Sequence, residues 1–210
     1  QLSADLFAQY REHFVGGFAR LLTGALFPSG FQSHAATETC PGHSTILTGA
    51  HPARNGIIAN NWFNPSIGRA EKKIYCSEDL SDPASTPNNP VVSANLLKVP
   101  TLGELMKAAN PATRNVAVSA KDRAVVMMGG HKIDAGYWWK GNGFVTFKGR
   151  DLAPAVQRAN AAASALLAKG APALKAPLWC GPRDRPVAIG AGTVGTYRFA
   201  LPKGAKPDVL

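Results

Sequence analysis

The chain has 210 residues, of which 45% are hydrophobic, and it carries a formal net charge of +10 at pH 7. This composition supports a sizeable hydrophobic core, and no apolar run approaches the roughly 20 residues of a membrane-spanning helix. The basic residues are scattered and not interleaved with aromatic residues, so the charge favours small anionic partners over nucleic acid as the main partner. The three cysteines, Cys40, Cys76 and Cys180, have no CxxC spacing, which excludes a zinc finger or ribbon.

The first predicted element is an amphipathic helix over residues 3–22. Its apolar side chains recur at steps of three and four residues, and Ser3 is suited to be its N-cap. Gly16 and Gly17 weaken the second half, because glycine has a low helix propensity. The recurring residues are Leu6, Tyr10, Phe14, Phe18 and Leu21.

The stretch from Thr37 to Gly49 runs from a polar turn into a short helix. Pro41 is predicted at the first helical position, where its missing N–H leaves no hydrogen bond unmade. Cys40 then lies near the N-cap and Thr39 one residue before it, where free N–H groups and the helix dipole favour an oxyanion. A hydroxyl beside an anion site suits a nucleophile in phosphoryl transfer, although position alone favours a capping or turn residue.

The following residues are predicted to be mostly irregular. A turn-rich connection over 51–56 leads into a short extended run over 57–63. The polar residues 67–94, rich in Pro, Asn and Ser, indicate a surface loop around a short strand at 74–76.

The second half of the chain alternates helices and strands. Thr101 and Glu104 have the spacing of a capping box, and Asp151 is suited to cap the last, Ala-rich helix. The predicted elements are helices over 100–109, 123–128 and 151–169, a strand over 115–119 and a hairpin within 131–148. This alternation predicts an α/β fold.

Three residues outside the Thr39 turn complete a polar cluster of phosphate size. Asn60 ends an extended run and offers an amide donor. Lys121 and Arg123 follow a strand, and residues two apart in an extended chain point to one side, so both cations face one anion while Asp122 points away. Ligand sites in open α/β sheets lie just beyond the carboxyl ends of strands. Taken singly, Asn60 is also explained as a turn amide, and the two cations as a solvated edge.

Two sequence blocks, TCPGHSTILTG at 39–49 and GIIANNWF at 56–63, resemble the type I phosphodiesterase/nucleotide pyrophosphatase branch of the alkaline phosphatase superfamily. The later Lys-Asp-Arg at 121–123 narrows the resemblance to the Thr-nucleophile bacterial alkaline phosphatases of the sphingomonad type. The resemblance runs from residue 3 to about residue 150. It implies an alkaline-phosphatase-like three-layer αβα sandwich, of which this chain is the N-terminal part.

The resemblance also implies roles for these residues. Thr39 would be the nucleophile that is transiently phosphorylated, and its hydroxyl would touch one of two zinc ions. Asn60 would bind a non-bridging phosphate oxygen, and Lys121 and Arg123 would bind the remaining charged oxygens of a monoester dianion. The implied function is zinc-dependent hydrolysis of small phosphate monoesters to inorganic phosphate. The alternatives are a phosphodiesterase of the same superfamily and an inactive anion-binding fragment.

The sequence departs from this family in its metal ligands. The resemblance implies Asp and His ligands for two Zn²⁺ ions, including an Asp-x-x-x-His, and none of them has a match here. His34, His51 and His131 have no metal spacing with one another or with His43, which is interpreted as structural support for the Thr39 turn. We therefore expect the remaining ligands outside this chain, and we expect the isolated chain to hold zinc poorly.

The organisation of the chain is predicted from its ends and its composition. It starts at Gln1 without an initiator Met or a signal-peptide pattern, and we expect a processed or truncated piece. Residues 1–169 are predicted to be the N-terminal part of the catalytic core, and the Pro- and Gly-rich residues 170–210 an excursion from it. The resemblance implies a periplasmic or secreted enzyme, where disulfides form. Whether Cys40 pairs with Cys76 or stays free is left open, as is the oligomeric state.

Overall fold

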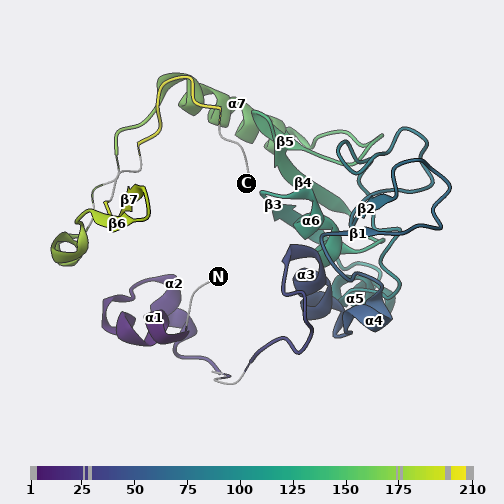
Figure 1. The fold of residues 1–210 in the computed structure, drawn as a ribbon, viewed down its shortest axis with the longest axis horizontal. Helices are drawn as coiled ribbons and strands as arrows, with labels where there is room; N and C mark the ends of the chain where they lie inside the picture. The colour runs from purple at the N-terminus through teal and green to yellow at the C-terminus, as the bar shows by residue number, and fades with distance from the viewer. Residues whose placement is uncertain are drawn as a thin grey trace. The chain divides into compact units, whose positions relative to one another are not determined.

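The computed structural model describes residues 4–25, 27, 30–173, 175, 177–196 and 200–206. The chain divides into two compact units, Gln1–Ser33 and His34–Leu210, and its helices and strands are labelled in Figure 1. No helix within the described residues is both long and apolar enough to cross a membrane.

The first unit has short helical segments where the sequence predicted one helix over 3–22. They are α1 (Ala4–Gln9), the 3-10 helix η1 (Arg11–His13) and α2 (Gly17–Leu21). Gly16 interrupts the helix with a φ of 64°, a left-handed conformation that glycine adopts without steric cost. The apolar spacing still brings aromatic rings together, since Phe14 lies 4.8 Å from Phe7 and 5.0 Å from Phe18 between ring centroids. Ser3, the predicted N-cap, lies outside the described residues.

The second unit contains a mixed sheet with the strand order β3-β4-β5. β3 (Val116–Ser119) and β4 (Ala135–Lys140) are parallel, and α6 (Asp122–Gly129) is the crossover that parallel neighbours require. β4 and β5 (Gly143–Val145) form an antiparallel hairpin. The predicted strand, helix and hairpin are therefore confirmed, and α6 packs against both β3 and β4.

Two further helices of this unit show how local signals set a helix start. The capping box before α5 (Leu102–Ala109) is confirmed, because the Thr101 N–H donates to Glu104 Oε2 at 2.8 Å. The helix α7 (Pro154–Lys169) ends where predicted, but its N-cap is Ala153 and not Asp151. Proline favours the first helical position, so Pro154 sets the N-cap two residues later than Asp151.

The segment between α3 (Thr39–Thr48) and α5 is more buried than its composition indicated. α4 (Pro52–Asn55) precedes β1 (Asn61–Phe63), which pairs antiparallel with β2 (Lys73–Tyr75). The prediction of a surface loop over 67–94 is wrong at its centre, where Cys76, Ser77 and Glu78 are 0% exposed. Burial of the Glu78 charge is possible because an arginine from the same loop pairs with it.

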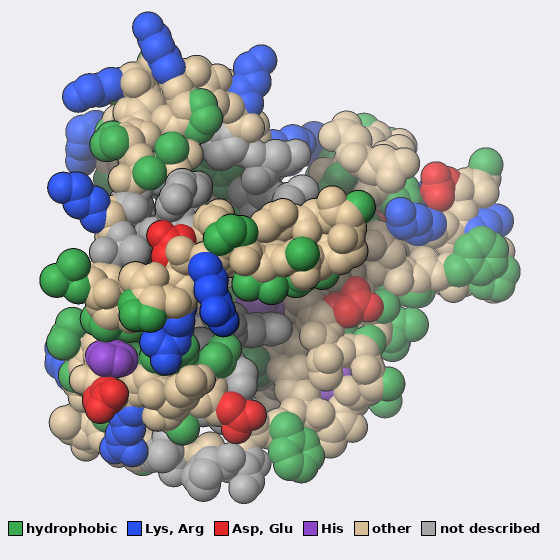
Figure 2. Space-filling model, turned by 60° about the vertical axis from the view of Figure 1, so that its left-hand side comes forward, with side chains coloured by type: hydrophobic (Ala, Val, Ile, Leu, Met, Phe, Trp, Pro, Cys, Tyr) green, Lys and Arg blue, Asp and Glu red, His purple; other side chains and the backbone are tan. Residues whose placement is uncertain are grey.

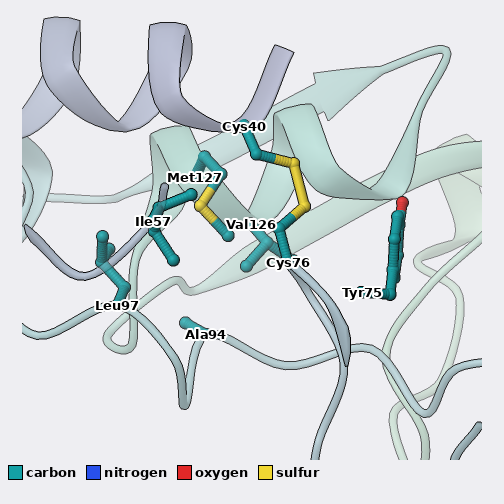
Figure 3. Packing of buried hydrophobic residues seen from close by; sticks show 8 residues of the cluster. All are labelled: Cys40, Ile57, Tyr75, Cys76, Ala94, Leu97, Val126 and Met127. Atoms are coloured by element: carbon teal, nitrogen blue, oxygen red, sulfur yellow. A yellow bond between two sulfur atoms is a disulfide. The ribbon is translucent and has the colours of Figure 1, made fainter. Parts of the chain in front are cut away.

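The core of the second unit joins α3 (Thr39–Thr48), α6 and the residue after β2. Cys40, Cys76, Val126 and Met127 are 0% exposed, and a disulfide connects Cys40 with Cys76, as Figure 3 shows. This disulfide decides the pairing that the sequence left open. Cys180 is a free cysteine.

The residues after α7 include the 3-10 helix η2 (Leu178–Arg183) and a hairpin of β6 (Val187–Ile189) and β7 (Gly192–Val194). All residues of the two strands are exposed. The boundary between residues 169 and 170 stays a prediction, because the division into compact units lies elsewhere.

The surface charge is spread as the sequence indicated. Figure 2 shows Lys and Arg side chains at several separate places on the visible face, with few Asp and Glu side chains between them.

Candidate active site

The helix that carries Thr39 begins earlier than predicted. Its N-cap is Glu38, so Thr39 is the first helical residue and Pro41 the third. Proline is tolerated there because none of the first N–H groups of a helix has an intrahelical acceptor. Thr39 therefore lies in the first turn of the helix, where the helix dipole acts most strongly, and not outside the helix as predicted.

The first turn of α3 is held by the side chain of Asn60. The Cys40 N–H donates to Asn60 Oδ1 at 2.8 Å, and the Asn60 N–H approaches Glu38 Oε2 at 3.4 Å. Because Oδ1 is the acceptor, the NH₂ group of Asn60 keeps both of its donors for another partner. Asn60 therefore fixes the Thr39 turn and offers a donor beside it.

A second set of hydrogen bonds fixes the same helix from within. His43 Nδ1 lies 2.7 Å from the Thr39 carbonyl oxygen, and the Ser44 hydroxyl donates to the Cys40 carbonyl at 2.8 Å. These contacts tie the residues around Thr39 to the next turn. They support the structural role that the sequence indicated for His43.

The backbone from Lys121 to Arg123 is not the continuous extended run that the sequence predicted. Lys121 is the N-cap of α6 with extended backbone angles, and the helix begins at Asp122. Alternation along an extended chain therefore ends at Lys121. The two cations (the cation pair hereafter) stand at the N-terminus of α6, where Lys121 is the N-cap and Arg123 the second helical residue.

The cation pair lines a pocket of about 790 Å³ beyond the carboxyl ends of β3 and β4. This is the edge of a parallel sheet where α/β proteins place their ligands. Lys140, Lys148, Trp138 and Trp139 also line the pocket. Asp122 lines it as well, so the prediction that Asp122 points away from the two cations is wrong. Within the described residues, neither member of the cation pair makes an ion pair, and Arg123 Nε is buried without an acceptor.

Tyr75, which the sequence indicated only as part of the short strand at 74–76, is a further residue of this site. Its hydroxyl donates to Asp122 Oδ1 at 2.7 Å, and Arg123 Cζ lies 5.8 Å from the centre of its ring. Burial and then the nearby Asp122 carboxylate raise the pKa of Tyr75 above its ordinary value, so its hydroxyl remains a donor. No local pattern identifies this contact, because Tyr75 and Asp122 are 47 residues apart.

The structure brings the four predicted site residues together in two halves. Thr39 and Asn60 meet through Cys40, and Lys121 and Arg123 meet at the pocket, whose lining does not include Thr39 or Asn60. Covalent and hydrogen bonds join the halves: Cys40 is bonded to Cys76, the Cys76 N–H donates to the Asn60 carbonyl at 3.0 Å, and Tyr75 holds Asp122.

The described residues do not form a metal site by themselves. No group of three His, Cys, Asp or Glu side chains suited to a metal is found in the described part of the chain. His43 faces the Thr39 carbonyl, and His131 Nδ1 lies 3.3 Å from Glu104 Oε1. The fit of these residues to zinc is thus limited to the Thr39 hydroxyl.

Comparison with known sequences gives the family of the chain. The family model for type I phosphodiesterase / nucleotide pyrophosphatase matches residues 1–164. The chain is 53% identical over 207 residues to alkaline phosphatase PhoK of a Sphingomonas species, which covers 97% of this chain and 37% of PhoK. It is 55% identical over 146 residues to alkaline phosphatase PhoD of Zymomonas mobilis, covering 70% of this chain and 25% of PhoD. The chain thus spans well under half the length of these relatives.

Solved structures of alkaline phosphatase PafA are similar in fold. The wild-type structure has a TM-score of 0.69 and 29% identity, covering 82% of this chain and 35% of PafA. A PafA variant with a substituted threonine, asparagine, lysine and arginine has a TM-score of 0.71 and 25% identity, covering 84% of this chain and 36% of that chain. These neighbours confirm the alkaline-phosphatase-like α/β fold predicted from the sequence, and the matched family model shows that the chain belongs to the type I phosphodiesterase / nucleotide pyrophosphatase family.

Proposed function

We propose that the protein is a phosphate monoester hydrolase that uses Thr39 as its nucleophile. The observation that carries this proposal is the cation pair: Lys121 and Arg123 line a pocket at the carboxyl edge of the sheet without an acidic partner among the described residues. Neither side chain has a counter-charge among the described residues, and a bound anion would supply one. A phosphate dianion provides both the charge and the acceptors.

Two comparisons support the residue assignment. Relatives that are 53% and 55% identical are alkaline phosphatases. The substituted residues of the PafA variant are of the same four types, its threonine and asparagine are as far apart as Thr39 and Asn60, and its lysine and arginine are two positions apart, like Lys121 and Arg123.

The proposed reaction has two steps at phosphorus. Thr39 Oγ1 attacks in line, its bond to phosphorus forms as the ester bond breaks, and the leaving alcohol takes up a proton. Water then attacks the phosphothreonine, which releases inorganic phosphate and restores the Thr39 hydroxyl. The Asn60 NH₂ and the cation pair hold the three non-bridging oxygens, where negative charge must be stabilised in both steps.

Zinc is the proposed cofactor, with ligands other than the Thr39 hydroxyl from outside this chain. A bound zinc lowers the pKa of a coordinated alcohol or water, which is the activation that a neutral threonine lacks. The described residues contribute the anion-binding side of the site, independent of the metal.

The substrates and the compartment follow from the same features. Two cations and one amide donor match the three charged oxygens of a small phosphate monoester. The Cys40–Cys76 disulfide suits the periplasm or the exterior, where such bonds persist. We propose one of these locations.

The test of the nucleophile uses the full-length protein with added zinc. We expect Thr39→Ala to lower turnover of p-nitrophenyl phosphate by on the order of 10³-fold or more, because the covalent step is removed. Acid-quenched wild-type enzyme should carry a phosphate on the peptide that contains Thr39, detected by mass spectrometry. Thr37→Ala is the matched control, since Thr37 is exposed and precedes the helix. Unchanged turnover in Thr39→Ala would refute the assignment.

A phosphodiesterase is the second candidate, because the matched family model carries that description. A diester has one negative charge on its phosphate and needs only part of the cation pair. The relative rates on p-nitrophenyl phosphate and bis-p-nitrophenyl phosphate decide between the two functions. A preference for the diester that survives removal of Lys121 and Arg123 would favour the second candidate.

A further inference from the structure

Tyr75 occupies a position between the two halves of the candidate site. It ends β2, is 8% exposed and precedes the disulfide-bonded Cys76. In Figure 3 its ring lies on the far side of Cys76 from Met127 of α6. The proposed reaction assigns no role to this buried phenol.

The hydroxyl of Tyr75 engages the carboxylate that separates the two cations. Asp122 Oδ1 accepts from the Tyr75 hydroxyl at 2.7 Å and from the Arg123 backbone N–H at 2.7 Å. The same carboxylate is the nearest acid in sequence to Lys121 and Arg123, yet it forms no ion pair with either side chain among the described residues. Tyr75 therefore holds one oxygen of the carboxylate that lies between the two cations in the sequence.

The ring of Tyr75 seats the guanidinium itself. Arg123 Cζ lies 5.8 Å from the ring centre, within the range in which a cation is attracted to an aromatic face. The ring offers no hydrogen-bond acceptor in its plane, so the guanidinium is restrained while its N–H groups stay available.

The main chain of Tyr75 is fixed on the opposite side. Its N–H donates to Glu78 Oε2 at 3.2 Å, and Glu78 is fully buried and paired with Arg69. The disulfide from the next residue reaches Cys40, the neighbour of Thr39. A single short segment thus sets the position of Arg123 relative to the nucleophile.

We propose that Tyr75 is a positioning residue that holds Arg123 for the charged oxygen found in a monoester but not in a diester. This inference rests on the proposed function and names what makes the site selective for phosphate dianions. It separates two actions of one side chain: the hydroxyl restrains Asp122, and the ring restrains the guanidinium.

The experiment compares Tyr75→Phe with wild type in the full-length protein with added zinc. Phenylalanine keeps the ring and removes the hydroxyl. We expect kcat/KM for p-nitrophenyl phosphate to fall about tenfold and the Kd of inorganic phosphate, measured by calorimetry, to rise by a similar factor, since one charge-assisted contact is misplaced. Hydrolysis of bis-p-nitrophenyl phosphate should change by less than about twofold, because a diester lacks the oxygen concerned.

A double-mutant cycle with Arg123→Ala tests whether Tyr75 acts through Arg123. In that background Tyr75→Phe should have no further effect on phosphate binding, because coupled residues are not additive. Tyr137→Phe is the matched control, as Tyr137 lies in β4 and its hydroxyl makes no hydrogen bond within the described residues. Equal losses on both substrates, or an additive loss in the cycle, would overturn the inference.

Failure of this inference is distinguishable from failure of the proposed function. If wild-type protein does not hydrolyse monoesters, the proposed function is wrong, while the phosphate-binding cycle still reports on Tyr75 and Arg123. If monoesters are hydrolysed and Tyr75→Phe binds phosphate as wild type does, the positioning role alone is wrong.

Discussion

Arg69 and Arg123 stand on either side of Tyr75 in very different surroundings. Every nitrogen of the Arg69 guanidinium has an acceptor: two carboxylate oxygens of Glu78 and the backbone carbonyls of Glu71, Lys73 and Ser85. The Arg123 guanidinium lies over the ring of Tyr75, makes no ion pair within the described residues, and has a buried Nε without an acceptor there. The first arginine is satisfied by the protein itself. Under the proposed function, the second binds the substrate phosphate.

The two arginines differ in the acceptors that the protein provides for them. Glu78 is 0% exposed and also accepts from the Tyr75 N–H, so its charge is stable only while Arg69 is present. Near Arg123 the available carboxylate, Asp122, is occupied by Tyr75 and a backbone N–H. The presence or absence of an internal acceptor thus separates the two roles, and the following variants test that separation.

Removal of Arg69 is expected to have the largest effect. Arg69→Ala leaves the Glu78 carboxylate buried without its partner, and breaking a buried pair costs about 3–5 kcal/mol of unfolding free energy. Urea denaturation of the full-length protein measures this loss. Activity per folded molecule should remain near that of wild type. A stable Arg69→Ala with impaired phosphate binding would reverse the roles assigned to the two arginines.

Removal of Arg123 is expected to act on activity and not on stability. Arg123→Ala should lower kcat/KM for p-nitrophenyl phosphate by about 10²–10³-fold, the usual cost of losing one donor to a developing charge. Lys121→Ala should act in the same direction. Arg123→Lys keeps the charge but loses the planar fork, so it should restore only part of the activity. Monoester hydrolysis unharmed by both alanine changes would remove the basis for the proposed function.

The sequence predicted those parts of the fold that local signals determine. The capping box of Thr101 and Glu104, the helix α6 and the hairpin of β4 and β5 all follow from residues close together in the chain. The prediction of one helix over 3–22 was wrong because α1 ends at Gln9 and Gly16 is the N-cap of a separate helix, while the apolar spacing continues through both breaks. Periodicity reports which side chains meet, as the ring contact of Phe14 and Phe18 shows, and not whether the helix is continuous.

The sequence predicted which residues form the candidate site, but not the long-range hydrogen bonds that hold them. The contact from Cys40 to Asn60 spans 20 residues and the contact from Tyr75 to Asp122 spans 47, so neither leaves a local pattern. The buried ion pair of Arg69 and Glu78 was not predicted, because charged residues in a polar loop normally indicate solvent exposure. Burial of that pair becomes visible only once the tertiary fold is known.

The disulfide connects the residue after β2 with α3, the helix that carries Thr39. Replacing both Cys40 and Cys76 with alanine should lower the unfolding free energy by about 2–4 kcal/mol, as expected for a buried bridge that closes a loop of this length. Wild-type stability should fall on reduction, and the double variant should be insensitive to reductant. Cys180→Ser is the control, because Cys180 is free and should show no such effect. An equal response of all three proteins would contradict the prediction.

The pH dependence of stability tests the environment of Tyr75. Because its pKa is raised in the folded state, its contribution is present below the unfolded pKa of about 10 and is lost as the pH rises through the folded pKa. Burial is the main cause and the Asp122 charge adds to it, partly opposed by Ser77 and Arg123. Tyr75→Phe should lower stability by about 1.5–3 kcal/mol at neutral pH. This difference should shrink above pH 10 by up to about 1.4 kcal/mol per pH unit.

Replacement of Lys148 is expected to have the smallest effect. It tests whether any cation in the pocket can take the role proposed for Arg123. Lys148 lines the same pocket as Arg123, but it is paired with Asp82 at 2.5 Å and its side chain is 65% exposed. Exposed pairs contribute little and are screened by salt, so Lys148→Gln should change kcat/KM for p-nitrophenyl phosphate by less than about twofold. Any residual change should vanish at high ionic strength, whereas the loss in Arg123→Ala should persist. If Lys148→Gln were as damaging as Arg123→Ala, general positive charge and not an unpaired guanidinium would govern binding in this pocket.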